Sequence, residues 1–299
     1  MCGIAGLVYK NTKHFSADLL EMLQCIQHRG PDASGIALFG DSEDLVLRVT
    51  IKAKELENQV LSVINEFGKV VGNYEFYASG NVWFADISLD VSEDKKAQLH
   101  ERLNEIKGVT VHSLSRKLKI FKENGPITNL TNHHVVSSGN GAVHGIGHVR
   151  MATESAEDVN AAHPFSSPFF PDLAIVHNGQ FTNYFKMRRF LESKGCIFKT
   201  MNDSEAASHL IAYAMKENDG DLEAALQFAL DEMDGIFCIL AATPTQIGFV
   251  KDKLGVKPLL LIEDDEKIMI GSEQIEFSSL AGDSFAEEME PGEVRVWNI

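Results

Sequence analysis

The chain has 299 residues, of which 44% are hydrophobic and 23% are charged, and its formal net charge is −16. This length allows one large domain or two ordinary ones, with an ample hydrophobic core. An acidic chain without a basic patch is poorly suited to nucleic acid or to an anionic membrane, because both present phosphates. We therefore expect its partners to be small molecules or proteins.

The four cysteines are far apart and lie in apolar stretches, at Cys2, Cys25, Cys196 and Cys238. That pattern indicates neither a disulfide scaffold nor a zinc site. The sequence contains no basic region followed by an apolar one at its start, and no run of about 18 apolar residues. We therefore expect a cytoplasmic protein.

Residues 1–8 place a cysteine directly after the initiator methionine and before a short apolar run. Removal of Met1 would give Cys2 both a thiol and a free α-amino group, whose reference pKa of about 7.7 to 8.0 lets it act as a base. The run that follows predicts a buried strand. A cysteine in such a run is, in general, more often a small core residue.

Downstream of this run, Ser16 can cap a helix whose apolar face includes Leu19, Leu23 and Ile26, and Gly30 is placed to end it. Turn-forming residues are dense at 27–35, which predicts an ordered loop. The chain then reads as a strand that returns to the sheet near residue 39.

Residues 41–125 have a different character, because charge rises and the order becomes strand, helix, strand, strand, helix, strand. Strands are predicted at 45–51, 69–77, 81–89 and 109–121, and helices at 54–67 and 92–107. This order is that of a ferredoxin-like βαββαβ module, which we interpret as an insertion. The alternative is a solvated extension of the main sheet.

Residues 126–140 are predicted to form a connecting loop between the module and the rest of a main domain, which comprises 1–40 and 141–299. A strand at 143–151 delivers Arg150 at its end, and a short strand at 173–176 stops at His177-Asn178-Gly179. The remaining pattern predicts helices at 182–194, 203–217 and 221–233 and strands at 236–242, 247–251, 259–262, 267–271 and 292–297. Strands, three helices and strands again indicate two packed sheets with helices outside.

Three places in the main domain carry side chains suited to a free α-amino acid. Arg150 offers a planar fork for a carboxylate, and Asp203 can hold an ammonium. The Asn178 side-chain amide and the Gly179 N–H could stabilise a tetrahedral oxyanion. Each also has an ordinary explanation, namely a surface ion pair for Arg150, a turn for Asn178-Gly179 and a helix cap for Asp203.

Metal and dinucleotide sites have weaker support. No carboxylate or cysteine cluster accompanies the candidate metal ligands His133, His134, His144 and His148, and strand positions four apart do not chelate easily. The dinucleotide motif Gly-x-Gly-x-x-Gly is not matched by the spacing of Gly139, Gly141, Gly145 and Gly147. We expect no metal and no bound cofactor in this chain.

An ordered set of motifs resembles class II glutamine amidotransferases. Any one motif is modest, but their order and spacing agree over nearly the whole chain apart from 41–140. The motifs are Met-Cys-Gly-Ile at 1–4, His-Arg-Gly-Pro-Asp at 28–32, Gly-His-Val-Arg-Met-Ala-Thr at 147–153, Asn160 to Pro164, His-Asn-Gly at 177–179, Asp-Ser-Glu at 203–205, Asp-Gly at 234–235, Lys-Asp-Lys-Leu-Gly-Val-Lys-Pro at 251–258 and Pro-Gly-Glu at 291–293.

This resemblance implies an α+β fold, the αββα sandwich of N-terminal nucleophile hydrolases, here with the inserted ferredoxin-like module. It also implies that Cys2, without Met1, attacks the side-chain amide of glutamine and releases glutamate and ammonia through a thioester. By the same resemblance, Arg150 binds the substrate α-carboxylate with Thr153 nearby, and Asp203 binds the α-ammonium. Asn178 and Gly179 match the oxyanion hole.

The sequence departs from the family at Met151 and Glu154, where several members have an aromatic residue and a histidine, and in its inserted module. No ammonia-using domain follows the motifs, so we expect ammonia to pass to another polypeptide or to be released. The layout is most similar to stand-alone subunits of glutamate-synthase-like and N-methylglutamate-synthase-like systems. That similarity implies an oligomer with a separate synthase subunit that contains flavin.

Two alternatives remain open at this point. The chain could be a non-enzymatic subunit that senses glutamine, with the module binding a second metabolite or a partner. It could also be an N-terminal cysteine hydrolase that acts on another amide.

Overall fold

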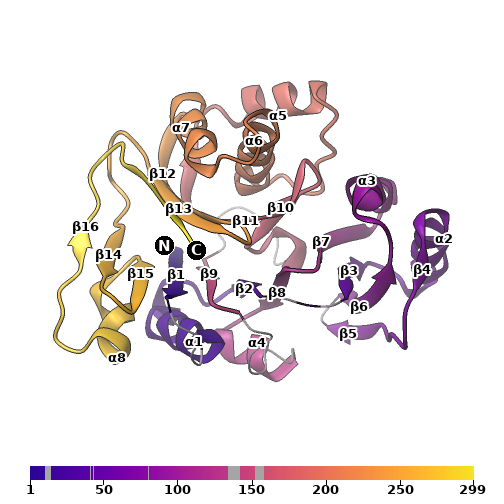
Figure 1. Ribbon diagram of the computed structural model, residues 1–299, viewed down its shortest axis with the longest axis horizontal. Coiled ribbons are helices and arrows are strands. Elements are labelled where there is room, and N and C mark those ends of the chain that lie inside the picture. The colour runs from indigo at the N-terminus through magenta and orange to yellow at the C-terminus, as the bar shows by residue number, and fades with distance from the viewer. Residues whose placement is uncertain (11–14, 41, 43, 80, 134–141, 152–157) are drawn as a thin grey trace.

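The computed structural model describes all residues except 11–14, 41, 43, 80, 134–141 and 152–157. Two antiparallel sheets form the larger part of the molecule (Figure 1). In the order of neighbouring strands, the first sheet consists of β16 (Glu287–Glu288), β14 (Leu260–Glu263), β15 (Lys267–Gly271), β1 (Gly3–Tyr9), β9 (His144–Arg150), β2 (Ala33–Phe39) and β8 (Leu118–Asn124). The second has the order β10-β11-β12-β13-β17, with bounds Phe165–Ser167, Phe170–Phe181, Gly235–Ala242, Gln246–Lys251 and Val294–Asn298.

The two sheets pack face to face through a shared apolar core. The first sheet contributes side chains such as Ile4 and Ile146, and the second contributes Val176, Cys238 and Leu240, all of them without solvent exposure. These strands are apolar on both faces, because helices cover their outer sides. Near-continuous apolar strands of this kind are typical of a buried sheet.

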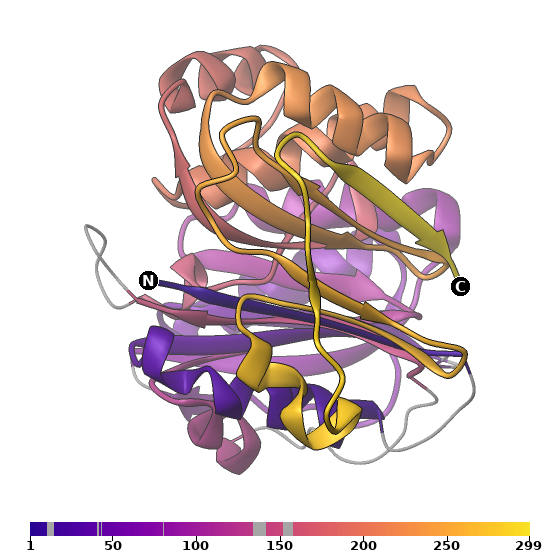
Figure 2. The same ribbon diagram turned by 90° about the vertical axis from the view of Figure 1, so that its left-hand side faces the viewer.

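Helices cover the outer face of each sheet, as Figure 2 shows. Leu19, Leu23 and Leu130 belong to the core below the first sheet, which is covered by α1 (Phe15–Cys25), α4 (Ile127–His133) and α8 (Ser278–Ala281). The second sheet is covered by α5 (Tyr184–Ser193), α6 (Asp203–Glu217) and α7 (Leu222–Glu232). The order helix, sheet, sheet, helix confirms the predicted αββα sandwich.

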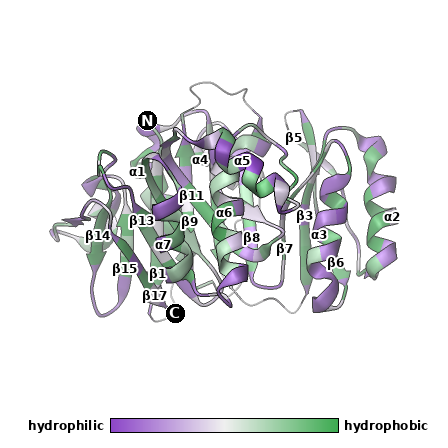
Figure 3. Ribbon diagram, turned by 90° about the horizontal axis from the view of Figure 1, so that it is seen from above, coloured by the Kyte–Doolittle hydropathy of each residue, from purple (hydrophilic) through white to green (hydrophobic). Residues whose placement is uncertain are grey.

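The inserted module is a separate antiparallel sheet with two helices and its own core. In the order of neighbouring strands, this sheet consists of β4 (Lys69–Val70), β6 (Val82–Asp90), β3 (Leu45–Ile51) and β7 (Val109–Ser115). A further short strand, β5 (Tyr77–Ser79), also pairs with β6. In chain order this is the arrangement 2-3-1-4 of a βαββαβ unit, the predicted ferredoxin-like topology. The helices α2 (Glu57–Phe67) and α3 (Lys96–Glu105) pack on this sheet beside the sandwich (Figure 3).

The structure corrects three boundaries that the sequence suggested. The extended run at 109–121 is two strands, and β8 leaves the module and pairs with β2 of the first sheet, with Lys122 opposite Gly35. The segment expected to be a loop contains α4, because Ile127 and Leu130 bury their side chains under the first sheet. The short strand expected at 173–176 is part of β11, which continues through Asn178 and Gly179 to residue 181.

Polar contacts fasten the module to the sandwich. Lys96 Nζ lies 2.7 Å from Asp172 Oδ2, and Ser115 Oγ donates to Asp172 Oδ1 at 2.5 Å. Thr50 Oγ1 donates to Asn160 Oδ1 at 2.8 Å. This junction is therefore held by specific polar contacts, in addition to the covalent connections.

Within the described part of the chain, no helix combines the length and apolarity needed to cross a membrane.

Candidate active site

The N-terminal segment is held in the middle of the first sheet, which fixes Cys2 in place. Strand β1 pairs with β15 on one side and with β9 on the other. The Ile4 N–H donates to Ser272 Oγ at 3.0 Å, and the half-buried Cys2 Sγ lies 3.8 Å from the Met151 carbonyl oxygen. A chain end usually frays unless tertiary contacts hold it. Here those contacts give the thiol a defined position, while Met1 remains exposed.

The loop at 27–32 braces the same segment through Arg29. The Arg29 Nε donates to the Cys2 carbonyl oxygen at 2.9 Å, and Nη1 pairs with Glu273 Oε1 at 2.5 Å. Gly30 has no room for a side chain, since a Cβ there would lie 2.4 Å from the Val149 carbonyl carbon. The sequence marked this loop as a motif but assigned Arg29 no role. The signal that the sequence offered was an arginine among turn-forming residues.

Arg150 ends β9 directly beside Cys2. The register pairs Gly3 with Val149 in an antiparallel arrangement. Cys2, which precedes Gly3, is therefore the neighbour of Arg150, which follows Val149. Arg150 is 5% exposed, and burial lowers the pKa of its guanidinium, while Cys2, Asp32 and Asp158 act to raise it. A surface ion pair is thus the wrong description of Arg150. Its charge is buried beside the thiol, where it would attract a carboxylate.

Asn178 and Gly179 lie within β11, so they are not the turn that ordinary statistics favour for this dipeptide. Asn178 is 2% exposed, and its Nδ2 has no hydrogen-bond partner in the described part of the structure. Leaving such a donor unsatisfied costs about 1 to 3 kcal/mol. At Gly179 the φ angle is +155°, and a Cβ would lie 2.0 Å from the Ile236 carbonyl oxygen, so only glycine fits.

Asp203 begins α6 but does not cap it. The cap is Asn202, whose side chain accepts from the Ser204 N–H at 2.9 Å. Asp203 Oδ2 accepts instead from the Phe181 N–H at 3.1 Å, and Oδ1 lies 3.8 Å from His177 Nδ1. Asp203 is therefore tied to the strand that carries Asn178, with its carboxylate partly open to solvent.

A histidine contact links the two sheets next to these residues. His148 on β9 lies with Nε2 3.1 Å from the His177 carbonyl oxygen, and its ring stacks on His163 with centroids 3.9 Å apart. Burial lowers the pKa of His148 to about 3, so the ring is neutral near pH 7. Because a carbonyl only accepts, the neutral ring must carry its proton on Nε2. No motif in the sequence predicted this contact.

The site as a whole joins residues from both sheets. Cys2 and Arg150 come from the first sheet, and Asn178, Gly179 and Asp203 come from the second sheet and its helix. Thr153, the remaining predicted substrate-binding residue, lies outside the described residues, as does Glu154. The described candidates are a thiol, a cation, an unpaired amide donor and a carboxylate, and the contact between His148 and the His177 carbonyl oxygen links the strands β9 and β11 next to them.

Comparisons with known proteins agree with this arrangement. A family model described as a glutamine amidotransferase domain matches residues 148–279. A protein of Methanothermobacter thermautotrophicus named as a candidate glutamine amidotransferase is 35% identical, with all of both chains aligned. The glutamine amidotransferase-like protein GlxB of Rhizobium meliloti is 32% identical, and the alignment covers all of this chain and 98% of that protein.

A solved structure has the same fold. The glutamine phosphoribosylpyrophosphate amidotransferase of Bacillus subtilis, solved with ADP and GMP, superposes with a TM-score of 0.62 and 21% sequence identity. The match covers 99% of this chain and 47% of that one, so this chain spans about half the length of that enzyme. From the full-length relatives, the ordered motifs and the sandwich fold, we conclude that the chain belongs to the class II glutamine amidotransferases.

Proposed function

We propose that this chain hydrolyses the side-chain amide of glutamine with Cys2 as the nucleophile, once Met1 has been removed, and delivers ammonia to a separate synthase subunit. The observation that carries the catalytic part is the buried Asn178 amide without a partner, beside a glycine that no other residue can replace. A donor left unsatisfied in the free protein is what an oxyanion hole requires.

The two charged side chains would orient the substrate. The Arg150 guanidinium would hold the α-carboxylate of glutamine beside Cys2, and the Asp203 carboxylate would hold the α-ammonium at the other end of the site. Thr153 is proposed to assist Arg150. Both ends of a free amino acid are then fixed, which brings the side-chain amide to the thiol and to Asn178.

The chemistry would then proceed through a thioester. The free α-amine of Cys2 takes the thiol proton, and the thiolate adds to the amide carbon. Asn178 Nδ2 and the Gly179 N–H bind the oxyanion that forms. As the C–N bond breaks, the Cys2 ammonium returns its proton to the leaving group, which departs as ammonia. Water, activated by the same amine, hydrolyses the thioester to glutamate and restores the thiol.

The measurement is ammonia release from glutamine by the wild type and by Cys2→Ala, with Cys25→Ala as the control for loss of a thiol elsewhere. We expect Cys2→Ala to lose turnover by more than about a thousandfold and to keep glutamine binding. Equal turnover in Cys2→Ala would contradict the proposal. A wild type that binds glutamine without releasing ammonia would favour the sensing role.

The destination of the ammonia rests on the resemblance to stand-alone subunits of glutamate-synthase-like systems. We propose a cytoplasmic assembly in which a separate subunit uses the ammonia. The flavin belongs to that partner subunit and not to this chain. Affinity purification from native cytoplasm should then recover a yellow partner subunit, and adding it should raise kcat. Full glutaminase activity in an isolated monomer, unchanged by cell extract, would contradict the partner.

A further inference from the structure

The start of β1 is held by side chains beyond the point where its backbone pairing with β15 ends. That pairing ends at Ala5, opposite Gly271, whereas the pairing of β1 with β9 continues to Gly3. On the side of β15, the residues before Ala5 therefore lie past the end of the ladder. A chain end needs tertiary contacts to stay ordered there. Residues 272–276, which follow β15, supply them.

The Ser272 hydroxyl takes the place of a paired strand at Ile4. Its Oγ accepts from the Ile4 N–H at 3.0 Å and donates to the Ile4 carbonyl oxygen at 3.4 Å. A hydroxyl can do both, because it has one proton and two lone pairs. Ser272 is buried, so the contact is shielded from water. The backbone two residues after the thiol thus depends on the position of this hydroxyl.

One buried carboxyl group, that of Glu276, holds both Ser272 and the next residue, Glu273. Its Oε1 accepts from the Ser272 N–H at 2.6 Å and from the Glu273 N–H at 2.9 Å. Glu273 in turn pairs with Arg29, which donates to the Cys2 carbonyl oxygen. Glu276 is therefore connected to the start of β1 by two routes, one through each of these neighbours.

We propose that Glu276 is a positioning residue for Cys2, which it holds in place by way of Ser272 and Glu273. The inference rests on the proposed function, in which the Cys2 thiol attacks glutamine. Loss of the Glu276 carboxyl should then lower kcat and leave KM nearly unchanged, because the groups proposed to bind the two ends of the substrate are untouched.

A simple helix cap does not account for all of these contacts. Glu273 and Glu276 form a capping box at the start of the 3₁₀-helical turn Gln274–Phe277, and the bond to the Glu273 N–H belongs to that box. The bond to the Ser272 N–H lies outside it. This second bond ties Ser272 itself to Glu276, while the Ser272 Oγ bonds to Ile4.

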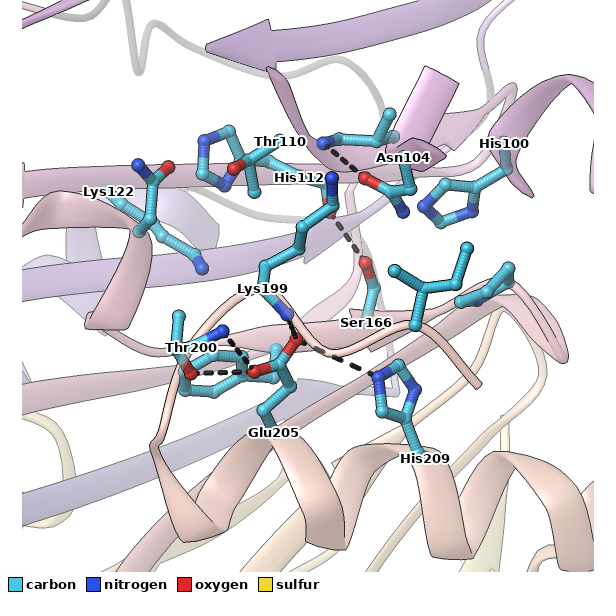
Figure 4. A pocket seen from close by; sticks show the side chains of 15 residues that line it. His100, Asn104, Thr110, His112, Lys122, Ser166, Lys199, Thr200, Glu205 and His209 are labelled. Atoms are coloured by element: carbon cyan, nitrogen blue, oxygen red, sulfur yellow. Dashed lines mark hydrogen bonds and ion pairs between the residues drawn. The ribbon is translucent and has the colours of Figure 1, made fainter. Parts of the chain in front are cut away.

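The Glu276 carboxyl is also less satisfied than that of another buried acid, Glu205. In the pocket between the module and the sandwich, Glu205 accepts with Oε1 from the Lys199 N–H and with Oε2 from the Thr200 N–H, both at 2.7 Å (Figure 4). Glu276 is 0% exposed, yet its Oε2 has no hydrogen-bond partner among the described residues. Such a group disfavours the folded state, so a role in the site explains it better than stability does.

Burial raises the pKa of the Glu276 carboxyl well above its ordinary value, although the two N–H bonds and the charge of Arg29 act to lower it. The uncharged form still offers Oε1 as an acceptor to both N–H groups. A glutamine side chain offers the same acceptor with nearly the same shape. Glu276→Gln is therefore the conservative variant, and it should retain the function that Glu276→Ala loses.

The test uses the full chain without Met1. Glu276→Ala removes the carboxyl group, and Ser272→Ala removes the hydroxyl that lies one step nearer the thiol. The matched control is Ser278→Ala, because Ser278 follows the same turn at an exposed position and its Oγ donates to the Ile275 carbonyl oxygen at 2.8 Å. This control removes a hydroxyl and its backbone contact without touching β1.

The first measurement is ammonia release from glutamine. Glu276→Ala and Ser272→Ala should lower kcat at least about tenfold and change KM less than about twofold, because a displaced nucleophile affects the chemical step. Glu276→Gln should recover most of the lost kcat, and Ser278→Ala should match the wild type. The double variant of Ser272 and Glu276 should lose no more than Glu276→Ala alone, because both changes act along one route.

The second measurement is exchange of the Ile4 amide hydrogen, followed by NMR in a chain with isotope-labelled isoleucine, which needs no catalysis. The exchange should be at least about tenfold faster in Glu276→Ala and in Ser272→Ala than in the wild type, and unchanged in Ser278→Ala. The amide of Ile239, buried in β12, should remain slow in every variant, which shows that the sandwich is folded.

Unchanged kcat and unchanged Ile4 exchange in Ser272→Ala and Glu276→Ala would overturn the inference. So would a loss confined to KM, a loss in Glu276→Gln as large as in Glu276→Ala, or exchange at Ile239 that rises together with exchange at Ile4. If Glu276→Ala does not fold, Ser272→Ala and Glu276→Gln decide. A wild type that releases no ammonia would contradict the proposed function instead, and Ile4 exchange would then show whether Glu276 holds the start of β1.

Discussion

The two sheets of the sandwich contribute to the site in different ways. The first sheet presents its residues where neighbouring strands end, with Cys2 and Arg150 side by side and braced by Arg29. The second sheet uses the interior of β11, where Asn178 and Gly179 lie, and ties Asp203 to the same strand. In the proposed function, Arg150 of the first sheet and Asp203 beside the second sheet hold the two charges of glutamine, so both sheets are needed. The site therefore depends on how the sheets pack, which the His148 contact helps to fix.

Among the substitutions that compare the two sheets, the largest effect should come from Asn178, the proposed oxyanion donor of the second sheet. Asn178→Ala removes a buried hydrogen-bond donor with no other partner, so kcat for ammonia release should fall about 10²- to 10³-fold. KM should change little, because the donor acts on the transition state. Gln180→Ala, an exposed change two residues along the same strand, is the control. An unchanged kcat in Asn178→Ala would remove the second sheet from the chemistry.

Substitution of Arg150 tests the first sheet. Arg150→Ala should raise KM for glutamine about 10- to 100-fold, because a charge-assisted contact with the carboxylate is lost. Arg150→Lys should recover only part of this, since it keeps the charge and loses the fork. The exposed Arg189→Ala is the control for loss of a positive charge. Wild-type KM in Arg150→Ala would show that another group binds the carboxylate.

The packing between the sheets should depend on pH through buried neutral histidines. Burial lowers the pKa of His148 to about 3 and that of His144 to about 4. In the unfolded chain the histidine pKa is about 6.5, so below pH 6.5 the unfolded chain binds more protons than the folded chain. The stabilisation that these neutral rings give the folded state is complete above pH 6.5 and is lost as the pH falls toward the folded-state pKa values. Each should add about 1.4 kcal/mol per pH unit to the slope of the unfolding free energy.

Urea denaturation between pH 6 and pH 4 measures that slope. His148→Gln should reduce it by about 1.4 kcal/mol per pH unit, and His144→Gln should do so until about pH 4, where its titration in the folded state begins. A slope equal to that of the wild type in both variants would mean that these rings are not held neutral in the sandwich.

The smallest effect concerns the module's attachment. Asp172→Ala removes one of the two carboxylates that pair with Lys96, the other being Glu93, and also removes the acceptor of Ser115. Because the Lys96 side chain is 8% exposed, the change should lower the free energy of unfolding by about 1 to 2 kcal/mol with kcat unchanged. Asp90→Ala breaks the exposed pair with Lys69 and should cost less than about 0.5 kcal/mol. Similar losses in the two variants would argue against a specific junction.

Much of the fold could be predicted from periodicity and from motif order. The sequence located β1, α6, α7 and the ferredoxin-like module, because their apolar spacing is regular and strong caps such as Asn202 and Asp221 mark the helix starts. The same motif order selected Cys2, Arg150, Asn178, Gly179 and Asp203 as candidate site residues, and their roles stay predictions. These features are local, so they can be read along the chain.

Features that depend on distant contacts could not be predicted in this way. The strand β8 begins at Leu118, directly after β7 ends at Ser115 and a short turn, and only its pairing with β2 places it in the first sheet. The contact of Arg29 with Cys2 and that of His148 with His177 join segments about 27 to 29 residues apart. No local pattern specifies such encounters.

The central claim is that Cys2 is the nucleophile and bears the free α-amine of the mature chain. Peptide mapping by mass spectrometry tests it directly, using active protein purified from the cells that make it and a glutamine analogue with an electrophilic carbon in place of the amide. We predict a single adduct on a peptide that begins at Cys2 and lacks Met1. An adduct on another residue, or full glutamine turnover by protein that retains Met1, would contradict the account.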